Sequence, residues 1–454
     1  MTGRSGQGDG GTGRTTGRAA IAPTHGAAQG GGPVFLFLQG PHGPFFRQLA
    51  RMLGAAGATC WRVGFNRGDA VFWGDRTSYV PFTAPQETWP DTFARLIAEK
   101  RVTDIVLYGD TRWIHAEAVR IARARGLAIH VFEEGYLRPY WVSYERGGSN
   151  GHSRLMAMSV AEMRAALAGA SRDTPVAPAH WGDMRQHIFY GALYHFFVMF
   201  ANRRYRGFRP HRDRPVAGEF ALYLRRLLLM PAHALDRRLA TRAVLRGGFP
   251  YHLVLLQLAH DSSFTAHSPF TSMSEFLDTV IAGFAAGAPR HHRLVFKAHP
   301  LEDGREPLAR EIKRLAREHG VETRVHHLRG GKLAKLLDQA RSAVTVNSTA
   351  AQQVLWRGLP LRAFGAAVYA KPEFVSTQPL AEFFARPTRP DSAAYRDFRA
   401  YLLETSQVAG GFYAGRSRRQ LLRQVVDMML SPDDAYDALA QGTAAPRQRL
   451  RAVP

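Results

Sequence analysis

The stretch Leu127–Pro139, LAIHVFEEGYLRP, decides how this chain is organised. Its apolar residues 127–132 predict a buried parallel strand, because such strands are short apolar runs bounded by turn residues. Two carboxylates, Glu133 and Glu134, follow, and then Gly135. Ligands of open α/β sheets bind beyond the carboxyl ends of the strands, so a reacting carboxylate would lie here. Adjacent side chains of an extended segment point in opposite directions, so at most one of the two acids faces a substrate. The alternative is a solvated loop with two surface acids.

Composition bounds the class of protein. The chain has 454 residues, of which 45% are hydrophobic and 21% charged, so it can bury large cores and form about three domains. The single cysteine, Cys60, excludes an internal disulfide and fits a reducing compartment. A net charge of +23 indicates an acidic partner, namely nucleic acid, an anionic membrane surface or a phosphorylated substrate. A base composition that favours Arg is the simpler source of that charge.

The ends of the chain differ from its middle. Residues 1–32 are rich in Gly, Thr, Arg and Ala, and we expect them to be disordered and to contain no signal peptide, because the apolar segment of one is missing. Residues 436–454 are expected to be a loose tail. No segment offers the ~18 uninterrupted apolar residues of a membrane span.

Residues 33–159 predict a Rossmann-like domain, because strand, polar Gly-containing turn and helix alternate. The turn after the first strand contains Gln39 and Gly40. It lacks the Lys-Ser/Thr of a P-loop and the spacing of a dinucleotide fingerprint, but it lets a ligand approach backbone N–H groups. A polar Gly-rich loop at 144–154 is expected to cover the same edge of the sheet. The predicted strands are 34–38, 59–65, 104–108 and 127–132.

Residues 160–250 show helical periodicity and no strand pattern. Residues 188–201 are apolar and aromatic, and residues 203–246 contain 12 Arg against three acids. An apolar aromatic helix beside dense Arg predicts a surface docked on anionic lipid. The alternative is a buried interdomain helix with a solvated basic neighbour.

Residues 251–386 predict a second Rossmann-like domain, with strands at 253–258, 293–297, 323–326, 343–346 and 361–364. Two such domains facing a cleft, here with a helical insertion between them, form the GT-B-like α/β architecture common among nucleotide-sugar glycosyltransferases. That analogy concerns the fold and does not fix the function. Residues 387–435 predict helices that cross back to the first domain.

Two strand ends of the second domain carry polar motifs. Lys297 and His299 can hold phosphate and ribose, and Pro300 fixes the turn, although a histidine alone in such a place is more often structural. The other motif opens a helix, whose free N–H groups and positive dipole end suit a phosphate; its alternative is an ordinary N-cap. That motif consists of Asn347, Ser348 and Thr349.

An acidic pair followed by Gly, together with a His-Pro in the second half, resembles CMP-sugar transferases of the bacterial sialyltransferase type. Over about residues 34–430 the chain is more specifically similar to the capsular polysaccharide β-Kdo transferases of the KpsS/LipB type. The segments that carry this resemblance are FLQGPHGPFF, FNRGDAVFW, YGDTRWIH, VFEEGYLRP, ERGGSNGHSR, QLAHDSSFTAHSPF, FKAHP, TVNSTAAQQVLWRGLP and SQVAGGFY.

The resemblance implies that Kdo moves from CMP-β-Kdo to a phosphatidylglycerol-type lipid, or to a Kdo already on it, with retention of configuration. The product would be the linker that joins a capsular polysaccharide to its lipid. It implies a cytoplasmic enzyme, peripheral on the inner face of the cytoplasmic membrane, with a second Kdo transferase and the capsule export machinery as candidate partners and no nucleic acid. The +23 charge fits the anionic sugar, nucleotide and lipid.

The resemblance makes Glu134 the expected catalytic carboxylate, as the nucleophile of a retaining transfer or as the base that deprotonates the acceptor. The family often has Asp at this position, so the role stays open. Lys297 and His299 are expected to bind the CMP phosphate and ribose, and Ser348 and Thr349 the leaving phosphate, with no metal or other cofactor required. The further carboxylates considered are Glu133, Asp261 and Asp110. The further binding residues expected are Pro300, Asn347, Gln39, Gly40 and Gly135.

Three other functions are alternatives to Kdo transfer. Another CMP-sugar transferase of the same fold would differ only in its donor. A non-catalytic capsule export component that binds lipid-linked glycan would not need an acid pair opposite a His-Pro. Nucleic-acid binding rests on charge alone, because we recognise no nucleic-acid-binding module.

Overall fold

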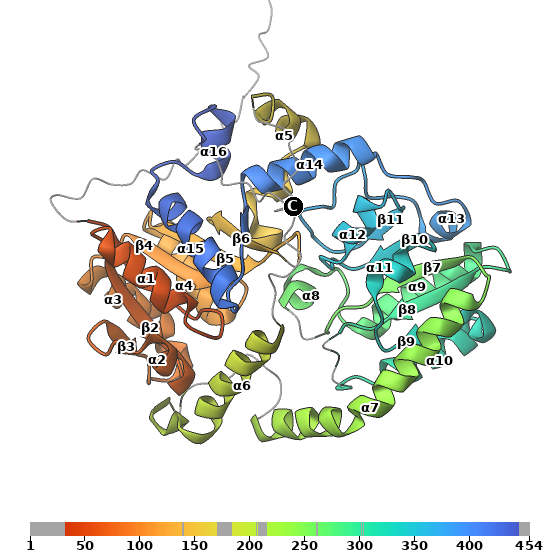
Figure 1. The fold of residues 1–454 in the computed structure, drawn as a ribbon, viewed down its shortest axis with the longest axis horizontal. Coiled ribbons are helices and arrows are strands. Elements are labelled where there is room, and N and C mark those ends of the chain that lie inside the picture. Colours follow the sequence, from red (N-terminus) through yellow and green to blue (C-terminus); the bar gives the residue numbers. More distant parts are fainter. Residues whose placement is uncertain are drawn as a thin grey trace, which may run out of the picture.

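The computed structural model describes residues 32–138, 140–169, 184–205, 207, 216–259, 262–300, 302 and 304–444. Figure 1 shows two α/β lobes side by side. The first lobe contains a seven-stranded sheet and the second a five-stranded sheet. The prediction of two Rossmann-like α/β units is therefore confirmed, and the arrangement is that of the GT-B fold. The predicted disorder of residues 1–32 falls almost wholly outside the described residues.

The first sheet has the strand order β12-β6-β5-β4-β1-β2-β3. Strands β1 to β5 run parallel, whereas β6 is antiparallel to both β5 and β12. The expected all-parallel sheet is thus mixed at one edge, because the short link between β5 and β6 permits only antiparallel pairing. The strands are β1 (Val34–Phe37), β2 (Thr59–Gly64), β3 (Tyr79–Pro81), β4 (Asp104–Tyr108), β5 (Ala128–Glu134), β6 (Trp141–Arg146) and β12 (Gln407–Ala409).

The end of β5 corrects two expectations. Glu133 and Glu134 do not follow the strand but are its last residues, paired with Ser143 and Val142 of β6. The apolar run ends at Phe132, yet the partner strand continues the ladder for two more residues. For the same reason, the loop predicted at 144–154 begins as strand.

Alternating side chains of the first sheet fill two cores. On β1 and the residue after it, Phe35 and Phe37 point to the face covered by α1 and α15 (Gly415–Leu430), whereas Leu36 and Leu38 point to the face covered by α3 and α4. The helices of this lobe before the link are α1 (Phe45–Ala55), α2 (Arg67–Trp73), α3 (Trp89–Glu99) and α4 (Trp113–Ala124).

The described residues between the lobes form helices, as their periodicity predicts: α5 (Val160–Ala166), α6 (Met184–Phe200) and α7 (Val216–Arg246). Helix α6 lies on the first lobe, where Tyr194 stacks on Phe72 of α2 and its hydroxyl accepts from Asn66 Nδ2 at 2.5 Å. Helix α7 runs along the second lobe, where Asp236 pairs with Arg329. No helix in the described part of the chain is long and apolar enough to cross a bilayer.

The second sheet is parallel throughout, in the order β11-β10-β7-β8-β9. Its strands are β7 (Tyr251–Leu255), β8 (Arg293–Lys297), β9 (Val325–Leu328), β10 (Ala340–Thr345) and β11 (Leu361–Ala363). Its helices are α8 (Ser262–His267), α9 (Met273–Gly287), α10 (Leu308–Glu318), α11 (Leu333–Leu337), α12 (Ala351–Trp356) and α13 (Leu380–Ala385).

After α14 (Ser392–Glu404) the chain returns to the first lobe through β12 and α15 (Gly415–Leu430). The expectation of a loose tail from residue 436 is wrong for its first residues, which belong to α16 (Ala435–Ala440). The Asp434 side chain caps this helix, and Tyr436 is buried. Residues 445–454 lie outside the described part.

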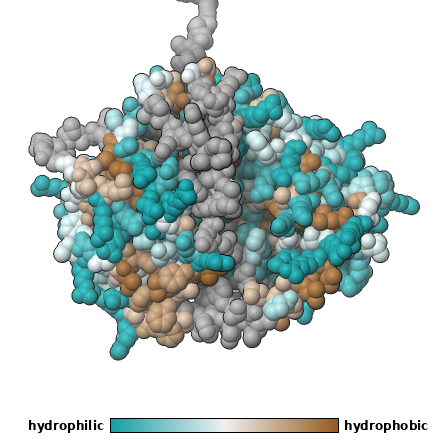
Figure 2. All heavy atoms as spheres, in the orientation of Figure 1, coloured by the Kyte–Doolittle hydropathy of each residue, from teal (hydrophilic) through white to brown (hydrophobic). Residues whose placement is uncertain are grey.

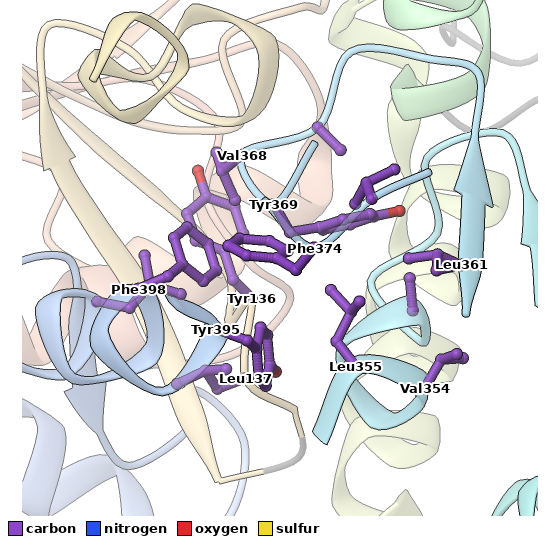
Figure 3. Close-up of a cluster of buried hydrophobic side chains, with 14 of the residues drawn as sticks. Tyr136, Leu137, Val354, Leu355, Leu361, Val368, Tyr369, Phe374, Tyr395 and Phe398 are labelled. Atoms are coloured by element: carbon purple, nitrogen blue, oxygen red, sulfur yellow. The ribbon is translucent and has the colours of Figure 1, made fainter. Parts of the chain in front are cut away.

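One hydrophobic cluster joins the two lobes (Figure 3). Tyr136 and Leu137, from the connection between β5 and β6, pack in the same cluster as residues of the second lobe. The position of that connection is therefore fixed by the second lobe. The residues labelled from α12, β11, the loop after it and α14 are Val354, Leu355, Leu361, Val368, Tyr369, Phe374, Tyr395 and Phe398.

Candidate active site between the lobes

A polar pocket lies where the β5–β6 connection meets the strand ends of the second lobe. Its empty space is about 610 Å³, including space that is open to solvent. The first lobe contributes Tyr136, Arg138 and Asn150. The second lobe contributes Gln257, His267, His299, Asn347, Ser348, Thr349, Gln352 and residues 366–369.

The Asn-Ser-Thr motif after β10 lines this pocket, as does His299 after β8, on the far side of β7 in the sheet. Asn347 is held by Gln257 through two hydrogen bonds: its Oδ1 accepts from Gln257 Nε2 at 2.7 Å, and its N–H donates to Gln257 Oε1 at 2.9 Å. The Ser348 carbonyl accepts from the Tyr369 hydroxyl at 2.8 Å. The structure therefore brings the two predicted polar motifs of the second lobe together.

Lys297 does not line the pocket with them. It is the last residue of β8 and is 7% exposed, and its Nζ donates to the Ala298 carbonyl at 3.4 Å. Burial lowers the pKa of Lys297. Of the Lys-Ala-His-Pro motif, His299 is thus the residue that the structure places at the pocket.

The two acids of β5 point to opposite faces of the sheet, as their alternation predicts. Glu134 Oε1 accepts from the Tyr108 hydroxyl at 3.3 Å. Glu133 Oε2 lies 2.9 Å from where a Cβ of Gly109 would stand, on the other side. Burial, and after it the charge of Glu134, raises the pKa of Tyr108 and that of Tyr413. Neither acid lines the pocket; Glu134 precedes the lining residue Tyr136 by two positions.

Gly135 has a steric role in this motif. Its N–H donates to the Trp141 carbonyl at 3.1 Å, and a Cβ on it would stand 2.1 Å from that oxygen. A side chain at Gly135 would force β6 to move. The hairpin between β5 and β6 therefore requires the glycine of the Glu-Glu-Gly sequence.

The remaining predicted residues are distributed over other places. Asp110 is 2% exposed, and its Oδ2 accepts from the Ser149 N–H at 2.9 Å. Gln39 donates through Nε2 to Asp69 Oδ2 at 3.2 Å, and Gly40 lines a separate pocket of about 270 Å³. The structure does not bring Gln39 and Gly40 to the interlobe pocket. Asp261 lies outside the described residues.

A buried carboxylate beneath the pocket escaped the sequence analysis. Glu145 Oε1 accepts from the Tyr136 hydroxyl at 2.6 Å, and its Oε2 accepts from the Tyr436 hydroxyl at 2.7 Å and from the Ser153 hydroxyl. The Tyr136 hydroxyl accepts in turn from the Asn150 N–H at 2.7 Å. Asn150 has φ +51, a left-handed conformation that is uncommon for residues other than Gly. Glu145 therefore orients two of the three pocket residues of the first lobe. The acidic residue within the strand-like sequence WVSYER was the signal that could have found it.

This network predicts a pH-dependent stability. Burial raises the pKa of Glu145 from 4.5 to about 7, so the folded protein holds this proton more tightly than the unfolded chain. The contribution of Glu145 to stability is complete below its pKa in the unfolded chain, 4.5. It is lost as the pH rises through the pKa of Glu145 in the folded protein, about 7. Between those limits the change amounts to about 3 kcal/mol.

We expect Glu145→Gln to remove this dependence, because the amide cannot ionise. The free energy of unfolding is measured with urea at pH 5 and pH 8. Its value for the variant should increase relative to that of the wild type as the pH rises. Glu99→Gln, on the exposed face of α3, is the control. Parallel pH profiles for Glu145→Gln and the wild type would contradict the assignment.

Comparison with known proteins gives a consistent family. Residues 103–413 match the family model described as "Capsule polysaccharide biosynthesis protein". The chain is 32% identical over 388 residues to "Capsule polysaccharide modification protein LipB" of Neisseria meningitidis serogroup A, covering 84% of this chain and 91% of that protein. It is 29% identical over 388 residues to "Capsule polysaccharide export protein KpsS" of Escherichia coli, covering 84% and 97%. Among solved structures, "Thermosulfurimonas dismutans KpsC, beta Kdo 2,7 transferase" superposes with a TM-score of 0.42 at 13% identity, covering 88% of this chain and all of that chain.

Proposed function

This chain belongs to the capsule polysaccharide biosynthesis protein family, and on that premise we propose that it is a retaining glycosyltransferase that moves Kdo from CMP-Kdo to an anionic lipid acceptor. The observation that carries the proposal is the interlobe pocket, which His299, Ser348 and Thr349 line from the second lobe and Arg138 from the first. The GT-B fold and the capsule-modifying relatives support a transferase. The motifs of the chain support Kdo as the sugar.

The lining chemistry suits an anionic sugar nucleotide. His299 and the hydroxyls of Ser348 and Thr349 can bind phosphate oxygens from one lobe, while Arg138 supplies a cation from the other. A transferase must stabilise the charge of its leaving nucleotide, and fixed donors in a partly closed pocket do so without reorganisation. Glu134, at the end of β5, would act on the sugar or on the acceptor hydroxyl.

The surface formed by α6 and α7 supports a lipid acceptor. Figure 2 shows hydrophobic surface where these two helices lie in Figure 1. Exposed apolar side chains next to Arg residues are typical of surfaces that bind anionic membranes. We therefore propose that this face, which we call the α6–α7 face, docks on the membrane that contains the acceptor. Its exposed apolar residues are Ile188, Phe189, Phe196, Phe200, Leu229, Met230, Leu235 and Leu239.

A transfer assay tests the proposal. The protein is incubated with CMP-Kdo, or with other CMP-sugars, and with phosphatidylglycerol or a Kdo-bearing lipid, and the products are identified by mass spectrometry. Product from CMP-Kdo alone supports the proposal. Product from another CMP-sugar would favour the sialyltransferase-like alternative, and CMP binding without any transfer would favour a non-catalytic capsule export component.

We expect His299→Ala to weaken the binding of CMP. Losing one hydrogen bond to a charged group costs about 1.5–3 kcal/mol, or roughly 10- to 150-fold in affinity. Calorimetric titration with CMP is the measurement. His319→Ala is the matched control, because His319 pairs with Asp278 on the outside of the second lobe. An unchanged affinity in a folded His299→Ala variant would remove His299 from the site.

A further inference from the structure

His267 carries a side chain of the second lobe against the first lobe at the edge of the pocket. It is the last residue of α8 and lines the pocket. Its Nδ1 lies 2.4 Å from where a Cβ of Gly151 would stand, so the absence of a side chain at Gly151 makes the approach possible. Its Nε2 is buried and has no hydrogen-bond partner within the described part of the chain. A ligand in the pocket can supply that partner.

A second imidazole links His267 to a buried carboxylate of the first lobe. The rings of His152 and His267 meet edge to face, with 5.1 Å between their centroids. His152 Nδ1 lies 3.2 Å from Asp110 Oδ2, and the His152 side chain is 49% exposed. The carboxylate can therefore fix the orientation of the His152 ring. The roles proposed above for the phosphate-binding residues and for Glu134 do not involve these contacts.

Burial and the cationic neighbours of His267 favour its neutral form. Burial lowers the pKa of His267, the charge of His152 lowers it further, and the charge of Asp110 acts in the opposite direction. Arg138 and His299, which share the pocket lining, are cations or potential cations as well. A phosphate in the pocket would reverse this balance, because an opposite charge within a few ångströms favours the imidazolium.

We propose that His267 takes up a proton when a nucleotide phosphate enters the pocket and then binds that phosphate as an imidazolium, with His152 and Asp110 as positioning residues. This inference rests on the proposed function, because it requires a nucleotide in the interlobe pocket. It adds a phosphate-binding residue from the second lobe, whereas Arg138 comes from the first, and it makes donor binding dependent on pH. By linkage, the affinity for CMP rises as the pH falls from 8 to 6, by up to about tenfold per pH unit for one proton.

Calorimetry with CMP tests the inference. Titrations at pH 7 in two buffers with different heats of ionisation give the number of protons taken up on binding. CMP exchanges protons of its own, since the second pKa of a phosphate is about 6, so the quantity that matters is the difference between variant and wild type. We expect His267→Gln to take up close to one proton fewer and to bind CMP with a flatter pH profile.

Two further variants make the test specific. His152→Gln removes the cationic neighbour, so the pH profile should move to higher pH while proton uptake persists; this also tests the inference if His267→Gln does not fold. His319→Gln should behave as wild type. CMP binding with the same proton uptake in His267→Gln, or an uptake that is lost in His299→Gln instead, overturns the inference and leaves the proposed function standing. A wild-type protein that does not bind CMP overturns both.

Discussion

Glu134→Gln should abolish most glycosyl transfer and leave CMP binding unchanged. The substitution keeps the size of the side chain and its hydrogen bond from Tyr108, and removes the charge. A base of this kind accelerates transfer by about 10²- to 10⁴-fold, and that loss belongs to the transition state rather than to donor binding. Transfer rates and CMP titrations on the same preparations are the measurements.

Glu133→Gln is the matched control, because Glu133 is the adjacent acid of β5 and points to the opposite face of the sheet. It should reduce transfer much less than Glu134→Gln. Near-normal transfer by Glu134→Gln would exclude both proposed roles, and Asp261 and Asp110 would then be tested.

A labelling experiment at Glu134 distinguishes the role of nucleophile from that of base. If Glu134 is the nucleophile, wild-type protein given CMP-Kdo without acceptor carries a Kdo adduct on the peptide that spans residues 132–138. A base never carries it. Mass spectrometry of the digested protein separates the two mechanisms.

The second large effect concerns the α6–α7 face. Phe196 and Phe200 of α6 are 52% and 67% exposed, and burying each in a membrane is worth about 1.5–3 kcal/mol. Phe196→Asp/Phe200→Asp should therefore lower binding to phosphatidylglycerol vesicles by about 10²-fold or more, as measured by flotation. Wild-type binding should weaken at high salt, because exposed charge attraction is screened.

Trp356→Asp is the control for this experiment, because Trp356 is also exposed, at 53%, but belongs to α12. It should float as wild type does. Equal binding of the wild type to neutral and anionic vesicles would contradict the electrostatic part of the proposal, and flotation of the double variant would contradict the choice of face.

The sequence predicted those parts of the fold that depend on local pattern. Strand β4 has the predicted bounds, Asp104–Tyr108, because an apolar run there is followed directly by a Gly turn. Strands β3 and β12 were missed because each is an edge strand of three residues. Strand β6 was missed because its last residues were assigned to a polar loop and one of its partners, β12, is distant in sequence. For β12 and β6, Gln407 pairs with Ser143.

For the candidate site, too, the sequence predicted what depends on local pattern and missed what depends on distant partners. His299 and Ser348 were expected together because parallel strands end at one edge of a sheet. Glu145 could not be found in that way, since its environment depends on Tyr436, 291 positions further along. His267 and its contact with Gly151 likewise depend on how the lobes meet. Lys297, predicted beside His299, is buried at the end of β8 and does not line the pocket.

The return of the chain to the first lobe has a consequence for its synthesis. A domain at the beginning of a chain usually folds while the ribosome is still translating the remaining residues. Here the first sheet lacks its edge strand β12, and one of its cores lacks α15, until more than four hundred residues have been made. The nascent first lobe therefore presents an unpaired β6 and an uncovered face next to α1 throughout the synthesis of the second. A premature stop after α14 would leave the first lobe unfinished even though every residue between β1 and β6 is present.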